Sequence, residues 1–265
     1  MNKPADTGAY LRFAHSLADA CGEAILRHFR NPGEIRSKGK AFDPVTQADR
    51  QAEAVAREMI AARYPHHAIQ GEEDADRTAD ASSLRWILDP IDGTRAFIMG
   101  LPLWGGLIGL YDGDTPLLGL MHQPFAGERY EGSEMGAFLT LRDGTRSSLR
   151  ARSCARLEEA ILGATDPNMF AAEHAQAFHR LGERVRMRRF GGDCYLYCAL
   201  AAGWLDLVVE DGLQPYDILP LIPIIEASGG VVTDWHGNPL VGGGSICAAG
   251  DAALHAQALS VLTDS

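Results

Sequence analysis

The sequence predicts a mixed protein of the α+β and α/β classes, and three observations support this prediction. Apolar residues recur at helical spacing near the start of the 265-residue chain. Short strands separated by turn residues follow in the middle of the chain. Beyond residue 156 the strands and helices alternate, which is typical of α/β proteins. We therefore expect two domains, residues 1–150 and 151–265, divided by the polar segment 142–156.

Residues 8–29 and 46–63 are expected to form two helices. Asn31-Pro32-Gly33 would end the first, and Thr46 would cap the start of the second. A short strand at 68–70 then delivers Glu72 just beyond its end. The first helix has one apolar face, which is formed by Leu11, Ala14, Leu17, Ala18, Cys21, Ile25 and Phe29.

The middle of the chain predicts an antiparallel meander, which follows a buried strand at 84–88. Its strands are expected near 102–111, 116–123, 129–132 and 137–141. The α/β part follows, with strands near 159–164, 186–190, 205–209, 230–233 and 246–249. Its helices are expected at 170–182, 192–202 and 216–228 and at the end of the chain.

Composition narrows the class of protein. The residues are 46% hydrophobic and 22% charged, no apolar run could span a bilayer, and no secretory segment is recognisable at the start, so we expect a cytoplasmic protein. The net charge of -11 argues against a nucleic-acid groove. The five cysteines lack zinc-ligand spacing and are expected to be reduced thiols.

The segment 84–94 carries the strongest functional signal, because an apolar strand ends in Asp89, Asp92, Gly93 and Thr94. Two nearby carboxylates repel each other unless a cation lies between them. A glycine-hydroxyl turn offers backbone N–H groups to an anion. Together these features indicate metal-assisted phosphoryl hydrolysis, although Asp, Pro, Gly and Thr are also ordinary turn residues.

Further acids follow other predicted strands: Glu72 after the strand at 68–70, Glu210 after the strand at 205–209, and Asp217 at the start of the next helix. Each acid alone has a simpler interpretation as a helix cap or a surface residue. Mg²⁺ prefers oxygen ligands in octahedral geometry and keeps several waters. The whole set, converging from separate elements, therefore predicts a Mg²⁺ site.

These motifs resemble the inositol monophosphatase family in both sequence and order. The resemblance rests on Asp43 to Asp49, Gly71-Glu72-Glu73, Trp86 to Thr94, Gln214-Pro-Tyr-Asp217, and Glu226-Ala-Ser-Gly-Gly230. It covers nearly the whole chain. It implies a Mg²⁺-dependent, lithium-sensitive phosphomonoesterase that is commonly a homodimer. The implied fold is the five-layer αβαβα sandwich of the inositol monophosphatase and fructose-1,6-bisphosphatase type.

The resemblance also implies residue roles. Thr94, hydrogen-bonded to Asp49, would position and help to deprotonate the attacking water. Backbone N–H groups of Gly93 and Thr94 would hold the phosphate, and either Lys38 or Lys40 is expected near the metals. The implied metal ligands are Glu72, Asp89, the carbonyl of Ile91, Asp92 and Asp217. The implied catalytic residues are Asp49, Glu72 and Thr94. Asp92 and Asp217 would also contact the substrate.

Other residues point to one branch of the family. Arg95-Ala96 stands where inositol-hydrolysing members carry Thr-Asn, and Tyr216 stands where they usually carry Trp. Segments 95–105, 165–170 and 190–197 resemble the histidinol-phosphate phosphatases instead, which implies L-histidinol phosphate as the small-molecule substrate.

The substrate-binding residues then expected are Arg95, Arg189, Asp193 and Glu210. Glu210 and Asp193 would recognise the ammonium and imidazole groups of histidinol. Arg189 would reach the phosphate of its own or of a partner subunit. For Arg189 and Asp193 a surface charge and a helix cap are simpler interpretations.

Two alternatives remain from the sequence. One is hydrolysis of another ester, such as an inositol, sugar or nucleotide 3′-phosphate. The other is an inactive binding protein that keeps the fold, against which the complete ligand set argues.

Overall fold

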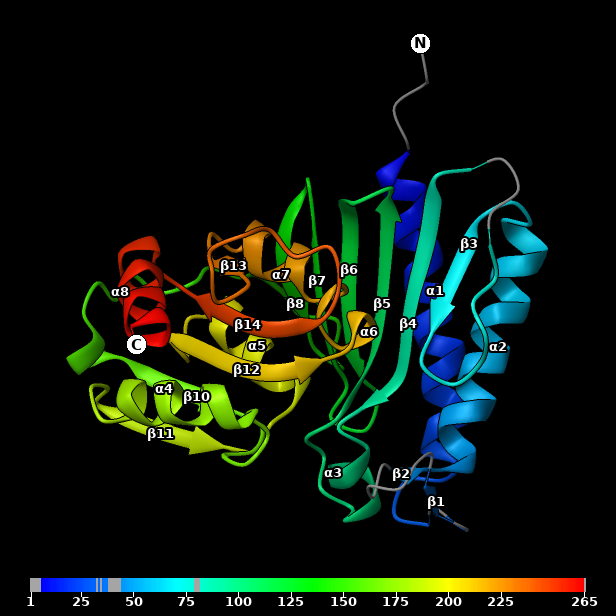
Figure 1. Cartoon of the computed structure of the whole chain (residues 1–265). Helices are drawn as coiled ribbons and strands as arrows, with labels where there is room; N and C mark the ends of the chain where they lie inside the picture. Colours follow the sequence, from blue (N-terminus) through cyan, green and yellow to red (C-terminus); the bar gives the residue numbers. More distant parts are fainter. Residues whose placement is uncertain (1–5, 32, 34, 38–43, 79–81, 265) are drawn as a thin grey trace.

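The computed structural model describes residues 6–31, 33, 35–37, 44–78 and 82–264. Two sheets and three layers of helices are stacked as an αβαβα sandwich, as Figure 1 shows. Helices α1 (Thr7–Leu26) and α2 (Gln47–Arg63) cover the outer face of one sheet. Helices α4 (Ala172–Gly182) and α8 (Ala252–Thr263) cover the far face of the other. The five-layer fold predicted from the resemblance is confirmed.

The two N-terminal helices form where the sequence predicts them. In α1 the carboxylate of Asp6 accepts a hydrogen bond from the Ala9 N–H, and the apolar stripe is buried against α2 and β6. The helix ends at Leu26 rather than near Phe29, because the chain then turns and Arg30 adopts a φ of 66°.

The first sheet has seven strands in the order β3-β4-β5-β6-β7-β8-β9. Strands β3 and β4 are parallel, and every later pair is antiparallel, so the predicted meander is confirmed. Strand β9 lies inside the segment expected to be a linker, because its backbone extends the ladder beyond β8. The strands are β3 (Ala68–Gly71), β4 (Leu84–Asp92), β5 (Gly105–Asp112), β6 (Thr115–Gln123), β7 (Glu128–Ser133), β8 (Gly136–Thr140) and β9 (Arg146–Ser148). A separate two-residue pair, β1 (Arg36–Ser37) and β2 (Pro44–Val45), was not predicted.

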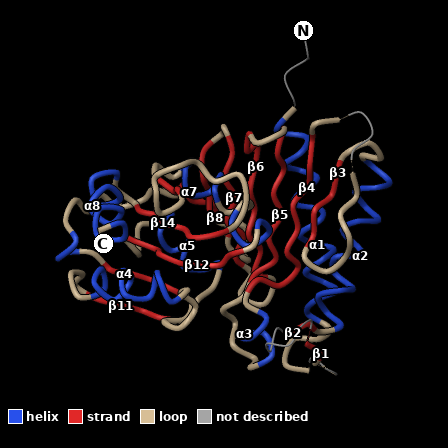
Figure 2. The backbone as a smooth tube through the Cα atoms, viewed as in Figure 1, coloured by secondary structure: helices blue, strands red, loops and turns tan. Residues whose placement is uncertain are grey.

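The second sheet has five strands in the order β11-β10-β12-β14-β13. Strand β10 is parallel to β11 and β12, whereas β14 is antiparallel to β12 and β13. Figure 2 shows helices on both faces of this sheet. The strands are β10 (Ile161–Ala164), β11 (Met187–Phe190), β12 (Leu207–Leu213), β13 (Val231–Thr233) and β14 (Gly244–Ala249), and a 3-10 turn, η1 (Leu157–Glu159), precedes β10.

The middle layer contains α5 (Cys194–Ala201), α6 (Pro215–Ile218) and α7 (Ile222–Ala227). The single helix predicted at 216–228 is divided in two around Pro220, which lacks the N–H that a continuous helix needs. Glycines let this layer approach the first sheet closely. A Cβ at Gly119 would lie 1.9 Å from the Pro220 carbonyl oxygen, so no side chain fits there.

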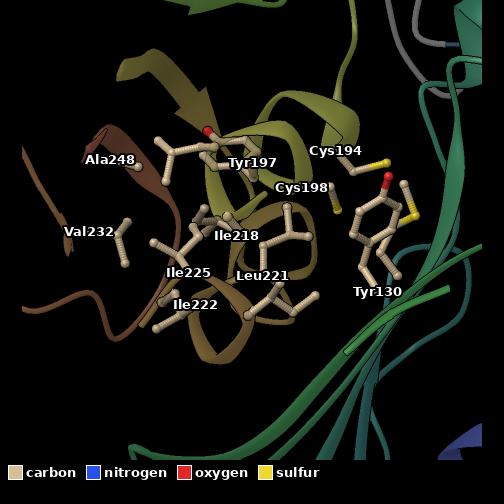
Figure 3. Close-up of a cluster of buried hydrophobic side chains, with 14 of the residues drawn as sticks. Tyr130, Cys194, Tyr197, Cys198, Ile218, Leu221, Ile222, Ile225, Val232 and Ala248 are labelled. Atoms are coloured by element: carbon tan, nitrogen blue, oxygen red, sulfur yellow. The ribbon is translucent and has the colours of Figure 1, made fainter. Parts of the chain in front are cut away.

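One buried cluster joins the two halves of the chain. Tyr130 of the first sheet and Ile225 and Leu221 of the middle layer belong to it, together with Ala248 of the second sheet (Figure 3). The division into domains at residue 150 stays a prediction. Among the described helices none combines the length and apolarity needed to cross a membrane.

Candidate active site

The ends of β4 and β12 point toward each other above α3 (Thr94–Ile98), as Figure 1 shows. Between them lies a cavity of about 340 Å³, within the usual range of about 300–1,000 Å³ for ligand pockets. The starts of α5 and α6 complete its walls. The lining residues are Glu72, Asp92, Gly93, Thr94, Arg95, Thr165, Met169, Asp193, Cys194, Tyr197, Glu210, Gly212, Leu213, Gln214, Tyr216 and Asp217.

Three carboxylates meet at one end of this pocket. Asp89, Asp92 and Asp217 each place an oxygen within 4.8 Å of the others. Burial, followed by the charges of Glu72, Asp92 and Asp217, raises the pKa of Asp89 well above its ordinary value. Burial and the charges of Asp193 and Asp217 do the same to the pKa of Asp92. This crowding of oxygen ligands fits a divalent cation, which would remove the repulsion between them.

The turn after β4 requires a glycine. Gly93 has a φ of 90°, and a Cβ there would lie 2.8 Å from the Leu103 carbonyl oxygen. The turn starts α3, in which the Phe97 N–H donates to the Gly93 carbonyl. The Asp92 side chain is held by the Cys194 backbone N–H, which donates to Oδ2 at 2.5 Å. The acid is thereby fixed between the two sheets.

The expectation that Thr94 is hydrogen-bonded to Asp49 is wrong. The Thr94 hydroxyl donates to the carbonyl of Ile91 at 3.1 Å. Asp49 Oδ2 accepts from both the N–H and the hydroxyl of Thr46, because the two residues form the capping box of α2. Asp49 remains close enough to Glu72 for that charge to add to burial in raising its pKa. Its Oδ1 is buried and, among the described residues, has no hydrogen-bond partner.

Glu72 lines the pocket from a loop that a second acid holds in place. Glu53 of α2 is 1% exposed and accepts from the Glu73 N–H at 2.8 Å and the Asp74 N–H at 3.0 Å. Arg57 pairs with Glu53 at 2.7 Å and also donates to the Asp74 carbonyl at 2.8 Å. The loop that carries Glu72 is therefore anchored to α2 through backbone hydrogen bonds.

Two more acids, Asp193 and Glu210, line the pocket. Glu210 is 2% exposed and accepts from the Thr165 N–H and the Tyr197 hydroxyl, each at 2.7 Å. Burial raises its pKa, although these hydrogen bonds oppose the shift. Burial and then the charge of Glu210 raise the pKa of Asp193 to about 6, while Arg95 opposes the shift. Asp193 also has a φ of 47°, a strained conformation for a residue other than glycine.

Comparison with known proteins agrees with this geometry. The inositol monophosphatase family model matches residues 7–264. The chain belongs to the inositol monophosphatase family. It is 42% identical to the bifunctional phosphatase IMPL2, chloroplastic, of Arabidopsis thaliana, over 95% of this chain and 75% of that protein. It is 34% identical to a histidinol-phosphatase of Chlorobaculum parvum, over 86% of each chain.

Solved structures agree as well. An inositol monophosphatase from Zymomonas mobilis superposes with a TM-score of 0.85 at 38% identity, covering 97% of this chain and 99% of that one. Like these relatives, the chain is therefore a phosphatase of the inositol monophosphatase family, which comprises phosphoric monoester hydrolases. Metal dependence is general in this family, and the acid cluster fits it.

In this family member most predicted site residues come together, but not all. Arg189 is exposed on β11, outside the lining of the pocket, because β11 is the edge strand of its sheet. Lys38 and Lys40 lie outside the described residues. Asp89 lies behind the pocket wall at 2% exposure, and the Ile91 carbonyl is occupied by Thr94.

Some pocket residues were missed from the sequence. Tyr197 was not predicted as a site residue; it is buried in the core, and its hydroxyl donates to Glu210. Its position four residues after Asp193 on α5, one helical turn away, is a signal that could have revealed it. Met169 and Leu213 also line the pocket, and nothing in their local sequence distinguishes them from core residues.

Proposed function

We propose that the protein is a Mg²⁺-dependent phosphomonoesterase that hydrolyses L-histidinol phosphate to L-histidinol and phosphate. The observation that carries this proposal is a second group of acids in the same pocket. Asp193 and Glu210 line the same pocket as Asp92 and Asp217 but do not belong to the three-carboxylate cluster. The cluster of Asp89, Asp92 and Asp217 suits a cation and a phosphate, so Asp193 and Glu210 are available to bind the alcohol part of the substrate.

The cation ligands proposed are Glu72, Asp89, Ile91 through its carbonyl, Asp92 and Asp217. A divalent cation bound there supplies Lewis-acid polarisation of the phosphoryl group and activates water. Thr94 and Gly93 bind the phosphate, and the hydroxyl of Thr94 orients the attacking water. Asp49, whose buried Oδ1 has no hydrogen-bond partner among the described residues and whose pKa is raised partly by the charge of Glu72, is the proposed proton acceptor.

The chemistry of the leaving group favours histidinol over a polyol. Histidinol carries an ammonium group and an imidazole, and carboxylates bind both through charge-assisted hydrogen bonds. Each Glu210 oxygen already accepts one hydrogen bond and retains a lone pair for a second. A neutral polyol would leave the buried Glu210 without an opposite charge, which costs binding energy. Relatives named histidinol-phosphatase support the same choice.

A direct comparison of substrates tests the proposal. Phosphate release from L-histidinol phosphate and inositol 1-phosphate would be measured at matched concentrations with Mg²⁺. We expect a kcat/KM at least tenfold higher for histidinol phosphate. Glu210→Gln keeps an oxygen that accepts from the Thr165 N–H, and its NH2 can donate to the Tyr197 hydroxyl oxygen, but it loses the charge, so the preference should fall. A strong preference for inositol phosphate would overturn the substrate, and no hydrolysis of either would favour an inactive binding protein.

Inositol phosphate is the second candidate, because relatives named inositol-1-monophosphatase also match, one of them at 31% identity. Three finer expectations belong to the proposal. Mg²⁺ is the expected cation, a homodimer is the expected assembly, and the cytoplasm is the expected compartment. The five cysteines are unpaired thiols, which supports a reducing compartment. Sedimentation of the purified protein tests the dimer.

A further inference from the structure

The loop that joins β10 to α4, residues 165–171, is attached at both ends to adjacent residues of β12. At its start the Thr165 N–H donates to Glu210 Oε1 at 2.7 Å. At its end the Ala171 N–H donates to Asp211 Oδ2 at 2.9 Å. Successive residues of a strand point to opposite faces of the sheet. The end of β12 therefore holds this loop from both faces.

A histidine completes the second attachment. His174 Nδ1 lies 2.8 Å from Asp211 Oδ2, and its ring packs on Trp235 with 4.5 Å between the centroids. Phe170, at 8% exposure, stacks on Phe178 with 3.9 Å between the centroids. A polar contact and aromatic packing together fix the end of the loop.

Between the two attachments the loop presents Met169 to the pocket. Met169 is half-buried, packs against the hydrophobic cluster that contains Phe170, and also lines the pocket with Thr165. Inside the loop the Met169 N–H donates to the Asp166 carbonyl at 3.2 Å, and Asp166 Oδ1 accepts from the Asn168 N–H at 2.9 Å. The Met169 backbone is therefore held within a hydrogen-bonded turn.

We propose that Met169 is a specificity-determining residue that packs against the ring of the leaving group, and that Asp211 and His174 are positioning residues that hold it there. The hydrogen bond between Thr165 and Glu210 places the loop beside the acid that is proposed to bind the leaving group. Met169 would thus contact the alcohol part of the substrate, which is the leaving group. A thioether is apolar and polarisable, and it packs well against a flat ring. This inference rests on the proposed phosphatase function.

A simpler role for Asp211 has to be separated from this one. The N-cap residue of α4, Ala171, has no side chain that could cap the helix, so Asp211 also serves as a cap from another element. Loss of a cap destabilises the fold but affects all substrates alike. Loss of positioning changes the ratio between substrates.

The first test replaces Met169, a pocket-lining residue. Met169→Ala and a matched control, Met135→Ala in the turn between β7 and β8, would be assayed on L-histidinol phosphate and on glycerol 2-phosphate with Mg²⁺. We expect the ratio of the two kcat/KM values to fall about tenfold in Met169→Ala only. An unchanged ratio would overturn the role of Met169.

Binding of L-histidinol, measured by calorimetry, gives a readout that needs no turnover. Met169→Ala should bind it about tenfold more weakly than the wild type. A wild type that hydrolyses neither ester but binds L-histidinol through Met169 would refute the proposed function and keep the inference. If the wild type hydrolyses both esters, and Met169→Ala changes neither the ratio of the two kcat/KM values nor the affinity for L-histidinol, then the phosphatase function stands and the inference about Met169 is refuted.

The second test separates positioning from capping. Asp211→Ala and His174→Leu should lower the substrate ratio about fivefold, through KM. His174→Asn, which places an amide donor near the former Nδ1, should restore most of it. Asp251→Ala, which removes the cap of α8, should lower Tm and leave the ratio unchanged. If Asp211→Ala behaves like Asp251→Ala, then Asp211 is a structural cap only.

Discussion

Two aspartates, one just before β12 and one at the end of β4, have opposite surroundings. Asp206, just before β12, is fully buried, and Arg152 binds both its oxygens, at 2.9 and 2.6 Å. The Ile161 N–H adds a third hydrogen bond at 2.8 Å. Asp92, at the end of β4, has one hydrogen bond from the Cys194 N–H and is otherwise crowded by acids.

The difference separates acids that hold the fold from acids that hold a ligand. A buried charge persists only when it is paired and hydrogen-bonded. Asp206 finds its partners within the chain, whereas for Asp92 we propose that a cation from outside supplies the missing partner. An acid surrounded by donors is therefore structural, and an acid surrounded by acids indicates a ligand site.

The largest expected effect is on catalysis. Asp92→Asn keeps an oxygen that can accept from the Cys194 N–H but removes the charge that binds the cation. We expect kcat/KM with Mg²⁺ to fall about 10³-fold, or about 4 kcal/mol of barrier, with Tm in the absence of metal unchanged or raised. Steady-state phosphate release and thermal unfolding measure the two quantities. Undiminished Mg²⁺-dependent hydrolysis would refute the metal-site assignment.

The converse substitution should affect stability instead. Asp206→Asn leaves Arg152 without its carboxylate and weakens three hydrogen bonds, so the free energy of unfolding should fall by about 3 kcal/mol. In the folded fraction, kcat/KM should match the wild type, because Asp206 lies outside the pocket. Urea unfolding and activity at low temperature check both. A stable variant with impaired catalysis would break the distinction.

Removal of the metal sharpens the same comparison. At about a hundredfold excess over its Kd, Mg²⁺ should stabilise the wild type by about 2.7 kcal/mol, because it binds only the folded protein. Chelation should therefore lower Tm in the wild type and in Asp206→Asn alike. In Asp92→Asn the shift should be much smaller. Equal shifts in all three proteins would place the cation somewhere other than the acid cluster.

The sequence allowed these regions to be predicted unequally. The site acids follow apolar strands, so local patterns revealed Asp89, Asp92 and Glu72. The pairing of Asp206 with Arg152 joins residues 54 positions apart and has no local signal. The prediction that Asp49 binds Thr94 was wrong because a local partner was overlooked. Thr46, three residues before Asp49, donates to its carboxylate.

Proline explains why the single helix predicted at 216–228 is divided in two. The apolar run at 216–228 favours a helix, but Pro220 interrupts its backbone hydrogen bonds and α6 and α7 form instead. Strand β9 was missed because its residues are exposed and polar, and only pairing with β8 makes it a strand. Pro220 is visible in the sequence and was given too little weight, whereas the pairing of β9 with β8 is a tertiary contact that no local pattern contains.

The smallest expected effect is on the pH dependence of stability, and it extends the comparison from the two aspartates to a basic residue, His122. Burial, followed by the charge of Arg129, lowers the pKa of His122 to about 4. Since the folded protein binds this proton more weakly than the unfolded chain, the stability that neutral His122 supports is complete above about pH 6.5 and is lost as the pH falls toward 4. The wild type should lose about 1.4 kcal/mol more than His122→Gln between pH 8 and pH 5.5. Urea unfolding at the two pH values measures this, with the exposed His179→Gln as a control that should keep the wild-type difference. An identical loss in His122→Gln would mean that His122 keeps its proton in the fold, and that crowding by like charge does not govern this base as it governs Asp92.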